Sequence, residues 1–465
     1  MVHNNWNLLN ISKTIFICSL SVVLLFIEFK SNKLHVAEQQ WFDNFQVGID
    51  GLIIGRMVKS HRDGIFSSGG LPGYAMPVKP LKIEDAELPY FQYKIYMQGL
   101  KFGNYQTYES HIGGQGMLFS FLNNLLENVA PEKRLNIFYS LNSLLAALAI
   151  TLVIAWFYQE FGLVAGLFVL VSAVFSQWLL VFGRLLWWSF WSFYLPMIVL
   201  MYYLKNNMPA SKSQYIKFAT IVFVVVLVKC LFAGYEYMTT ALIMMVVPFV
   251  YFGVANRISV GGYFKGAVAA IIGSLIAILL TFSILCFQIS TVEGSFLNGV
   301  NHIIYSYEKR TYADPEDTPA DYAATVEASR IGLVYNYMNG TFFDVNNYIK
   351  TSNSFLSNYL FKIKYLYLIF LFFVLSVFLC LYKGKYSPVS GDRSSLALVL
   401  ATWFSILAPL SWYIVFKAHS YAHQHLNCVV WQMPFTFFGF AVSGLAVKNV
   451  MAAMVLKESK IENSL

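Results

Sequence analysis

Long apolar runs separated by polar connections make up most of the chain. A helix of about 20 apolar residues crosses a hydrocarbon core roughly 30 Å thick. We therefore expect membrane helices wherever such runs recur. The predicted spans are residues 14 to 30, 136 to 158, 162 to 183, 185 to 204, 216 to 234, 237 to 255, 266 to 289, 363 to 383, 394 to 416 and 428 to 447. This pattern predicts an all-α polytopic membrane protein with about ten transmembrane helices.

The basic residues of the connections between these runs are distributed unevenly. One set of connections holds Lys13, Lys205, Lys212, Lys217, Arg257, Lys265, Lys383, Lys385, Arg393, Lys448, Lys457 and Lys460. The short turns of the opposite set hold only Arg184 and Lys417. Because cytoplasmic connections carry the excess of lysine and arginine, we predict that both termini lie in the cytoplasm. Residues 1 to 465 then form one integral membrane domain with two large extracytoplasmic loops, residues 31 to 135 and 290 to 362.

Both predicted loops carry aromatic and apolar residues at a density unlike that of a disordered linker. In the first loop, the apolar spacing from Val47 to Val58 fits an amphipathic helix on the membrane surface. Glycine, serine and proline over residues 67 to 75 indicate a turn that ends it. We expect juxtamembrane helices in both loops.

Composition supports the membrane assignment, since 57% of the residues are hydrophobic and only 12% are charged. That leaves too little polar surface to cover a soluble globule of this size. The formal net charge is +8, but the basic residues lie between apolar runs and form no stripe or patch, so no nucleic-acid partner is predicted. The five cysteines lie in or against apolar segments, which offers no disulfide framework outside the membrane.

Four ionisable residues lie within or at the edge of predicted spans, on the predicted outer side: Arg184, Lys229, Glu236 and Lys417. Charged groups in such places are costly and suggest function. Some of them also have a purely structural interpretation. Lys229 could extend to the membrane interface or pair with Glu236, seven residues later. Arg184 could anchor the helix end to lipid headgroups instead of binding substrate. Together the cations would suit a lipid phosphate.

Three of the eight histidines lie in the predicted turn from residue 417 to 427: His419, His423 and His425. Two of them are four residues apart, as metal ligands on one helical face are. No carboxylate or cysteine within the turn completes a metal site, so we predict that the histidines hydrogen-bond substrate; interfacial packing and a bound metal with His425 as third ligand are the alternatives.

The stretch from Asp50 to Phe66, Asp-Gly-Leu-Ile-Ile-Gly-Arg-Met-Val-Lys-Ser-His-Arg-Asp-Gly-Ile-Phe, follows the first membrane helix by about twenty residues. It resembles the start of the GT-C glycosyltransferases, such as lipid A aminoarabinose transferases and protein O-mannosyltransferases. In those enzymes an Asp or Asp-Glu opens the first outer loop. Gly51 departs from the pattern, and Asp43 is the nearest second acidic residue. A solvated or helix-capping carboxylate is the alternative role of Asp50.

The resemblance implies a bacterial inner-membrane enzyme whose active site faces the periplasm. It would move a sugar from a polyprenyl-phosphate donor to a glycan or lipid-linked acceptor of the cell envelope, such as O-antigen or lipopolysaccharide. Asp50 would be the general base, the cations would hold the leaving phosphate, and no cofactor is needed. Besides membrane lipids, donor and acceptor are the implied partners. The implied substrate-binding residues are Asp43, Arg56, His111, Gln115, Arg184, Lys229, Glu236, Lys417, His419, His423 and His425.

Aromatic residues near these positions would offer flat faces to sugar and isoprenoid; they are Tyr90, Tyr93, Tyr105, Tyr108, Trp187, Trp188 and Trp191. A lipid-carried donor also agrees with the sequence, which has no glycine-rich phosphate loop after a strand and no cytoplasmic domain. A flippase or transporter for lipid-linked saccharides remains an alternative, as do an O-antigen polymerase or ligase and a membrane O-acyltransferase.

Overall fold

The computed structural model describes residues 8 to 78, 87 to 312, 323 to 381 and 393 to 462. Helices dominate this part of the chain, and its strands are confined to two short two-stranded sheets. A helix satisfies its backbone N–H and C=O groups internally, which is the requirement for crossing lipid. The fold agrees with the predicted all-α polytopic membrane protein.

Among the described residues, seven helical segments are long and apolar enough to cross a membrane. They comprise α1 (Leu8–Ser31), α6 (Pro131–Phe161), α10 (Lys212–Ala233), α11 (Met238–Ala255), α12 (Val260–Glu293), α17 with α18 (Arg393–Ser405 and Leu407–Val415) and α20 (Phe435–Glu462). The pair α7 (Leu163–Val174) and α8 (Gln177–Gly183) meets the same criteria but bends by 67°, as a broken span or a re-entrant loop does.

Two more predicted spans fall on apolar helices that are too short by themselves, α9 (Trp191–Leu204) with 14 residues and α16 (Tyr365–Leu381) with 17. The structure thus supports seven or eight of the ten predicted spans by length. The predicted start of the last span is wrong. Residues from 427 form the short helix η5 (Asn427–Gln432), and α20 begins only at Phe435, after Pro434.

The membrane helices approach one another closely at glycines. A Cβ on Gly273 of α12 would lie 2.4 Å from the carbonyl oxygen of Ala219 on α10. A Cβ on Gly444 of α20 would lie 2.6 Å from Cα of Ala165 on α7. Small residues allow such contact between helix backbones, which favours association in lipid through van der Waals packing. The bend before α8 begins a new helix, because Ser176 Oγ accepts the backbone N–H of Leu179 at 3.3 Å.

The first loop folds into a compact unit of α2 (Gln39–Asn44), α3 (Val47–Asp63), η1 (Ser67–Gly70), β1 (Gly73–Pro77), α4 (Leu88–Gln98), β2 (Phe102–Thr107) and α5 (Gly114–Leu125). Strands β1 and β2 pair antiparallel, with Gly73 opposite Thr107. The predicted helix at Val47 is confirmed and continues to Asp63. The prediction of a surface helix is wrong, because α4, α5 and β1 cover α3 and bury residues 50 to 57.

Gly55 shows why α3 and β1 can pack so closely. A Cβ at this position would lie 2.1 Å from the carbonyl oxygen of Gly73 on β1, so only glycine fits. The side chain of Gln92 on α4 completes the contact, since its Nε2 donates to Ala75 O at 3.1 Å and its Oε1 accepts from Ala75 N at 2.9 Å. This unit is held by buried backbone contacts as well as by apolar packing.

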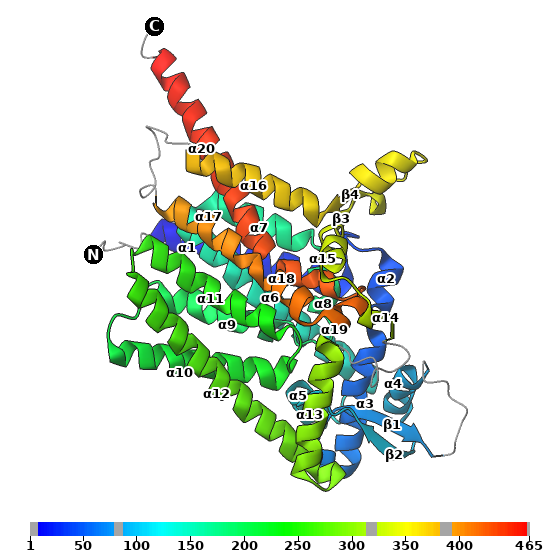
Figure 1. Cartoon of the computed structure of the whole chain (residues 1–465). Helices are drawn as coiled ribbons and strands as arrows, with labels where there is room; N and C mark the ends of the chain where they lie inside the picture. The colour runs from blue at the N-terminus through cyan, green and yellow to red at the C-terminus, as the bar shows by residue number, and fades with distance from the viewer. Residues whose placement is uncertain (1–7, 79–86, 313–322, 382–392, 463–465) are drawn as a thin grey trace.

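The second loop contains α13 (Phe296–Thr311), α14 (Ala323–Val326), α15 (Arg330–Met338), β3 (Thr341–Asp344), η3 (Val345–Asn347), η4 (Leu356–Leu360) and β4 (Lys362–Lys364). Helix α19 (Lys417–Ala422) follows α18 and contacts α13, α14 and α15. Figure 1 shows both chain ends toward one end of the helix bundle and the elements of the two loops at the other.

Candidate functional site

A cavity of about 960 Å³ lies where the two loops meet the ends of the membrane helices. Its wall combines residues that are far apart in the sequence: the segment after β2, the α8–α9 turn, the α10–α11 turn, α13 and the segment after α19. Of the predicted site residues, Glu236, His419, His423 and His425 line it, together with Tyr105, Tyr108, Trp187 and Trp188. We therefore take this cavity as the candidate site.

Glu236 is presented to the cavity by a strained turn between α10 and α11. Gly234 has φ of 54° and Tyr237 has φ of 50°, both in the left-handed region. The ammonium group of Lys229 stabilises the turn, donating to Gly234 O at 2.8 Å and to Glu236 O at 2.6 Å. Lys229 thus contacts the backbone of Glu236 and supports the turn that carries its carboxylate.

Two basic side chains approach the carboxylate of Glu236. Arg310 Nη2 lies 3.6 Å from Oε1, and His419 Nε2 lies 3.6 Å from Oε2. Burial alone would raise the pKa of Glu236, but His419, Arg310, His111 and His423 oppose it, and the pKa is lowered overall. Glu236 is therefore ionised at neutral pH, with a guanidinium group beside it.

The histidines pack as a row of rings. The ring centroid of His419 lies 4.6 Å from that of His423, which lies 5.8 Å from that of His425. Burial lowers the pKa of His419 to about 3 and also lowers the pKa of the other two. At neutral pH, Arg310 rather than His419 thus supplies the positive charge next to Glu236. Within the described ranges, no group of three or more His, Cys, Asp or Glu side chains is placed to hold a metal ion.

Trp187 and Trp188 form the aromatic wall of the cavity, and residues from the first loop hold Trp187 there. Its backbone N–H donates to Asp50 Oδ1 at 2.9 Å, and its carbonyl accepts from Gln115 Nε2 at 2.9 Å. The ring of His111 packs on the Trp187 ring with centroids 4.8 Å apart. Gln115 and His111 thus lie behind the wall and support it, and neither lines the cavity.

Asp50 is wholly buried and also lies behind Trp187, outside the cavity lining. Among the described residues, its Oδ2 makes no hydrogen bond of normal geometry, although the Tyr139 hydroxyl lies close enough to lower the pKa of the carboxyl group. Burial raises the pKa of Asp50 to about 6, although hydrogen bonds from the backbone of Trp187 and Leu186 oppose this shift. The neighbouring Gly51 has no room for a second acidic side chain, since its Cβ would lie 2.9 Å from Pro89 O.

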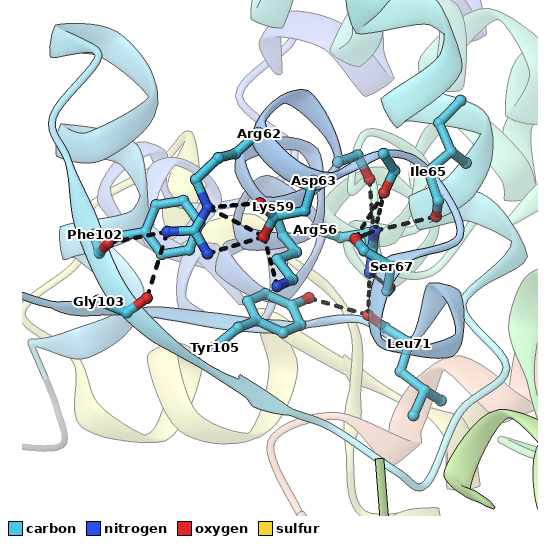
Figure 2. Close-up of polar contacts among 12 residues, drawn as sticks. Arg56, Lys59, Arg62, Asp63, Ile65, Ser67, Leu71, Phe102, Gly103 and Tyr105 are labelled. Carbon is cyan, nitrogen blue, oxygen red and sulfur yellow. Dashed lines mark hydrogen bonds and ion pairs between the residues drawn. The ribbon is translucent and has the colours of Figure 1, made fainter. Parts of the chain in front are cut away.

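Arg56 is buried in the first loop and organises the chain after α3 (Figure 2). Its guanidinium group donates to Ser60 Oγ and Ser67 Oγ. It also donates to the carbonyl oxygens of Gly64, Ile65, Ser67 and Leu71, at 2.6 to 3.3 Å. A planar guanidinium group with five donors suits such a set of acceptors. Arg56 therefore holds a loop and does not line the cavity.

The remaining predicted cations also bind backbone carbonyls. Arg184 Nη2 donates to Asp43 O at 2.9 Å and to Phe42 O, at the end of α2. Lys417 Nζ donates to Val326 O at 2.9 Å. Asp43 itself is exposed and accepts from Gln39. The structure thus brings Glu236 and the three histidines together, with Lys229 supporting the Glu236 turn, while Arg184 and Lys417 bind other loop segments.

A narrower apolar slot of about 180 Å³ adjoins the cavity. Its apolar wall comes from α12 (Ile278, Phe282, Leu285) and from Trp412 and Phe416 at the end of α18. Six residues line both spaces: Glu109, Ser110, Glu236, His302, Ser306 and Arg310. The polar cavity and the apolar slot therefore share one polar wall.

The sequence interpretation missed the contribution of α13. His302, Ser306, Lys309 and Arg310 all line the cavity from this helix. The spacing of three and four residues places them on one helical face. This spacing in the sequence could have indicated a shared polar face. Only the tertiary fold shows that this face meets Glu236.

Comparison of the chain with protein-family models, with curated proteins and with solved structures finds no match.

Proposed function

We propose that the protein is a membrane glycosyltransferase that moves a sugar from a polyprenyl-phosphate donor to an acceptor in this cavity. The observation that carries the proposal is the shared wall of a polar cavity and an apolar slot between α12 and α18. A substrate with a polar head and an isoprenoid tail matches both spaces at once. In this proposal the cavity faces the exterior of a bacterial cytoplasmic membrane, and the acceptor is a cell-envelope glycan or lipid.

Arg310 and Lys309 support the binding of the donor phosphate. Both line the cavity, and Arg310 also lines the slot, where the tail would enter. A guanidinium group binds phosphate oxygens through paired hydrogen bonds. Trp187, Trp188 and Tyr108 offer aromatic faces to the sugar on the same wall.

Glu236 is our candidate for the general base. Its carboxylate would take the proton of the acceptor hydroxyl while that oxygen attacks the anomeric carbon. The bond from the anomeric carbon to the phosphate oxygen breaks, and Arg310 stabilises the negative charge of the departing lipid phosphate. We assign Asp50, the base implied by the GT-C resemblance, a supporting role, because it lies behind Trp187.

The test is a transfer assay with the purified full-length protein in lipid nanodiscs. Radiolabelled polyprenyl-phosphate sugars are supplied with envelope lipid extract as acceptor, and the wild type is compared with Glu236→Gln. Asp63→Asn is the matched control, since Asp63 is a carboxylate paired with Lys59 and Arg62 at the end of α3 and outside the cavity. Transfer by the wild type and the control, but not by Glu236→Gln, is expected. Absence of transfer from every lipid donor would overturn the proposal.

A further inference from the structure

A serine, a histidine and a glutamate are aligned where the cavity meets the slot. Ser110 Oγ lies 3.2 Å from Nε2 of His302, and Nδ1 of the same ring lies 3.7 Å from Glu109 Oε2. The other carboxylate oxygen of Glu109 accepts from Thr107 Oγ1 at 3.0 Å. Ser110 and Glu109 come from the segment after β2, while His302 comes from α13, so the tertiary fold creates this order of groups.

A hydroxyl, an imidazole and a carboxylate in this order can activate the hydroxyl as a nucleophile. Burial lowers the pKa of His302, although Glu109 opposes this shift, so the ring is neutral at neutral pH. With its proton on Nδ1, facing Glu109, the ring leaves Nε2 free to accept the proton of Ser110. The 3.7 Å separation is longer than a hydrogen bond, and contacts of this kind shorten when substrate binds.

Ser306 Oγ also lies 3.2 Å from His302 Nε2, so two hydroxyls compete for one base. Ser306 lies inside α13, where backbone N–H groups are used in helical hydrogen bonds. Ser110 lies in a loop four residues before α5. We take Ser110 as the nucleophile because it lies outside a helix and next to Glu109 in the same loop. Ser306, whose hydroxyl lies 3.3 Å from that of Ser110, is its natural control.

Ser110, His302 and Glu109 each line both the cavity and the slot. An acyl chain lying against Phe282 and Leu285 in the slot would bring its carbonyl carbon to this junction. Arg310 shares the same wall and is placed to stabilise negative charge there.

We propose that Ser110 is the nucleophile of a second activity, the transfer or hydrolysis of an acyl group from a lipid ester. Ser110 Oγ attacks the ester carbonyl carbon and its proton passes to His302 Nε2. The bond to the leaving alcohol then breaks, and the alcohol takes that proton. Water or an acceptor hydroxyl attacks the Ser110 ester in the same way, which releases the acyl group and restores the serine. This proposal does not depend on the sugar-transfer activity.

The test uses the purified full-length protein in detergent micelles and an alkyl fluorophosphonate carrying a fluorophore. We expect the wild type to be labelled on the peptide containing Ser110, and Ser110→Ala to remain unlabelled. His302→Ala should be labelled at least about 100-fold more slowly and Glu109→Gln about tenfold more slowly. Ser306→Ala should stay within about threefold of the wild type, because the base and the nucleophile both remain.

A second measurement follows the hydrolysis of p-nitrophenyl esters of increasing chain length. The wild type should prefer longer chains, and Phe282→Ala should weaken that preference while leaving fluorophosphonate labelling in place. Thermal unfolding of each variant checks that it is folded. No labelling of the folded wild type, labelling on Ser306, or equal labelling of Ser110→Ala would overturn the proposal. The sugar-transfer assay with Glu236→Gln gives an independent result, so the two proposals can fail separately.

Discussion

Asp50 and Glu236 are two carboxylates near the loop end of the bundle, and they differ in their access to the cavity and in the charge beside them. Asp50 is wholly buried behind Trp187 and accepts a backbone N–H from that residue. Glu236 lines a cavity, with Arg310 and His419 each 3.6 Å from one of its oxygens. Burial disfavours the charged form of both carboxylates; at Glu236 the charges of His419 and Arg310 outweigh it, whereas at Asp50 burial prevails.

The comparison shows that burial of a carboxylate does not by itself indicate a catalytic residue. A raised pKa is common both at active sites and where a carboxyl group supports the fold. What separates the two regions is access to a space that can hold substrate, together with a positive charge to bind it. By these criteria Glu236 is the candidate for chemistry, and Asp50 is the candidate for holding the aromatic wall.

The largest effect is expected for Glu236→Gln. Loss of the general base should lower the turnover of sugar transfer by about 10³-fold. Asp50→Asn, which retains an oxygen that can accept from Trp187 N, should lower turnover by less than about tenfold. Steady-state rates with a labelled lipid donor measure both. A larger loss in Asp50→Asn than in Glu236→Gln would reverse the assigned roles.

The second prediction concerns how the difference in folding stability between the wild type and Asp50→Asn depends on pH. The pKa of Asp50 rises from 3.8 to about 6 in the folded protein, so folded Asp50 holds its proton at pH values where the unfolded chain has lost it. Stability of the wild type relative to Asp50→Asn should therefore fall as pH rises from about 4 to 6, by about 3 kcal/mol. Thermal unfolding of both proteins across this range measures the difference.

Asp63→Asn provides the control of opposite sign. Hydrogen bonds from Arg62 and Lys59 lower the pKa of Asp63 to about 2, so that its ionised form favours the folded state. Relative to this variant, the wild type should gain stability as pH rises from about 2 to 4.

A wild-type stability that does not fall relative to Asp50→Asn between pH 4 and 6 would contradict the buried position of Asp50.

A smaller effect is expected for Arg310→Gln. Removing one charge-assisted contact to the donor phosphate should raise KM for the lipid donor by about 10- to 100-fold. Loss of the guanidinium charge should also raise the pKa of Glu236 and shift the acid limb of the pH–rate profile to higher pH. Arg310→Lys should recover part of the KM but not the full affinity. An unchanged KM for the donor in Arg310→Gln would place the phosphate elsewhere.

The smallest effect is expected for His419→Gln. Burial lowers the pKa of His419 to about 3, so a neutral ring is replaced by a neutral amide at pH 7. Turnover should fall by no more than about two- to tenfold, through loss of a polar neighbour of Glu236. The pH–rate profile between pH 5 and 8 should keep its shape. A limb that disappears in His419→Gln would show that this histidine carries a titrating proton during turnover.

Much of the fold could be predicted from the chain because lipid imposes a simple requirement on each segment separately. Runs such as 136 to 158 and 266 to 289 lie inside the long helices α6 and α12. The bend of 67° between α7 and α8 was not predicted, since hydropathy carries no information about a break inside an apolar run. The burial of α3 was missed for a similar reason, because its coverage by α4 and β1 depends on contacts between distant segments.

The candidate site was only partly predictable. Glu236 and the histidines stand out because ionisable groups at helix ends are unusual. Arg184, Lys229 and Lys417 stand out equally, yet each donates to backbone carbonyls of a neighbouring loop. Arg310 and His302 do not stand out, because charged residues are ordinary in a polar loop. Which cation faces a cavity and which supports a turn is a property of the assembled structure.

The sequence by itself determined that this protein is a polytopic membrane protein built from helices, because hydrophobic length is a local property that each segment satisfies alone. The tertiary structure alone decided which polar groups meet. It buried Asp50 behind Trp187, turned the face of α13 that carries Arg310 toward Glu236, and aligned Ser110 with His302 across 192 positions of sequence. These contacts arise between segments far apart in the chain, and their geometry follows from packing rather than from local pattern.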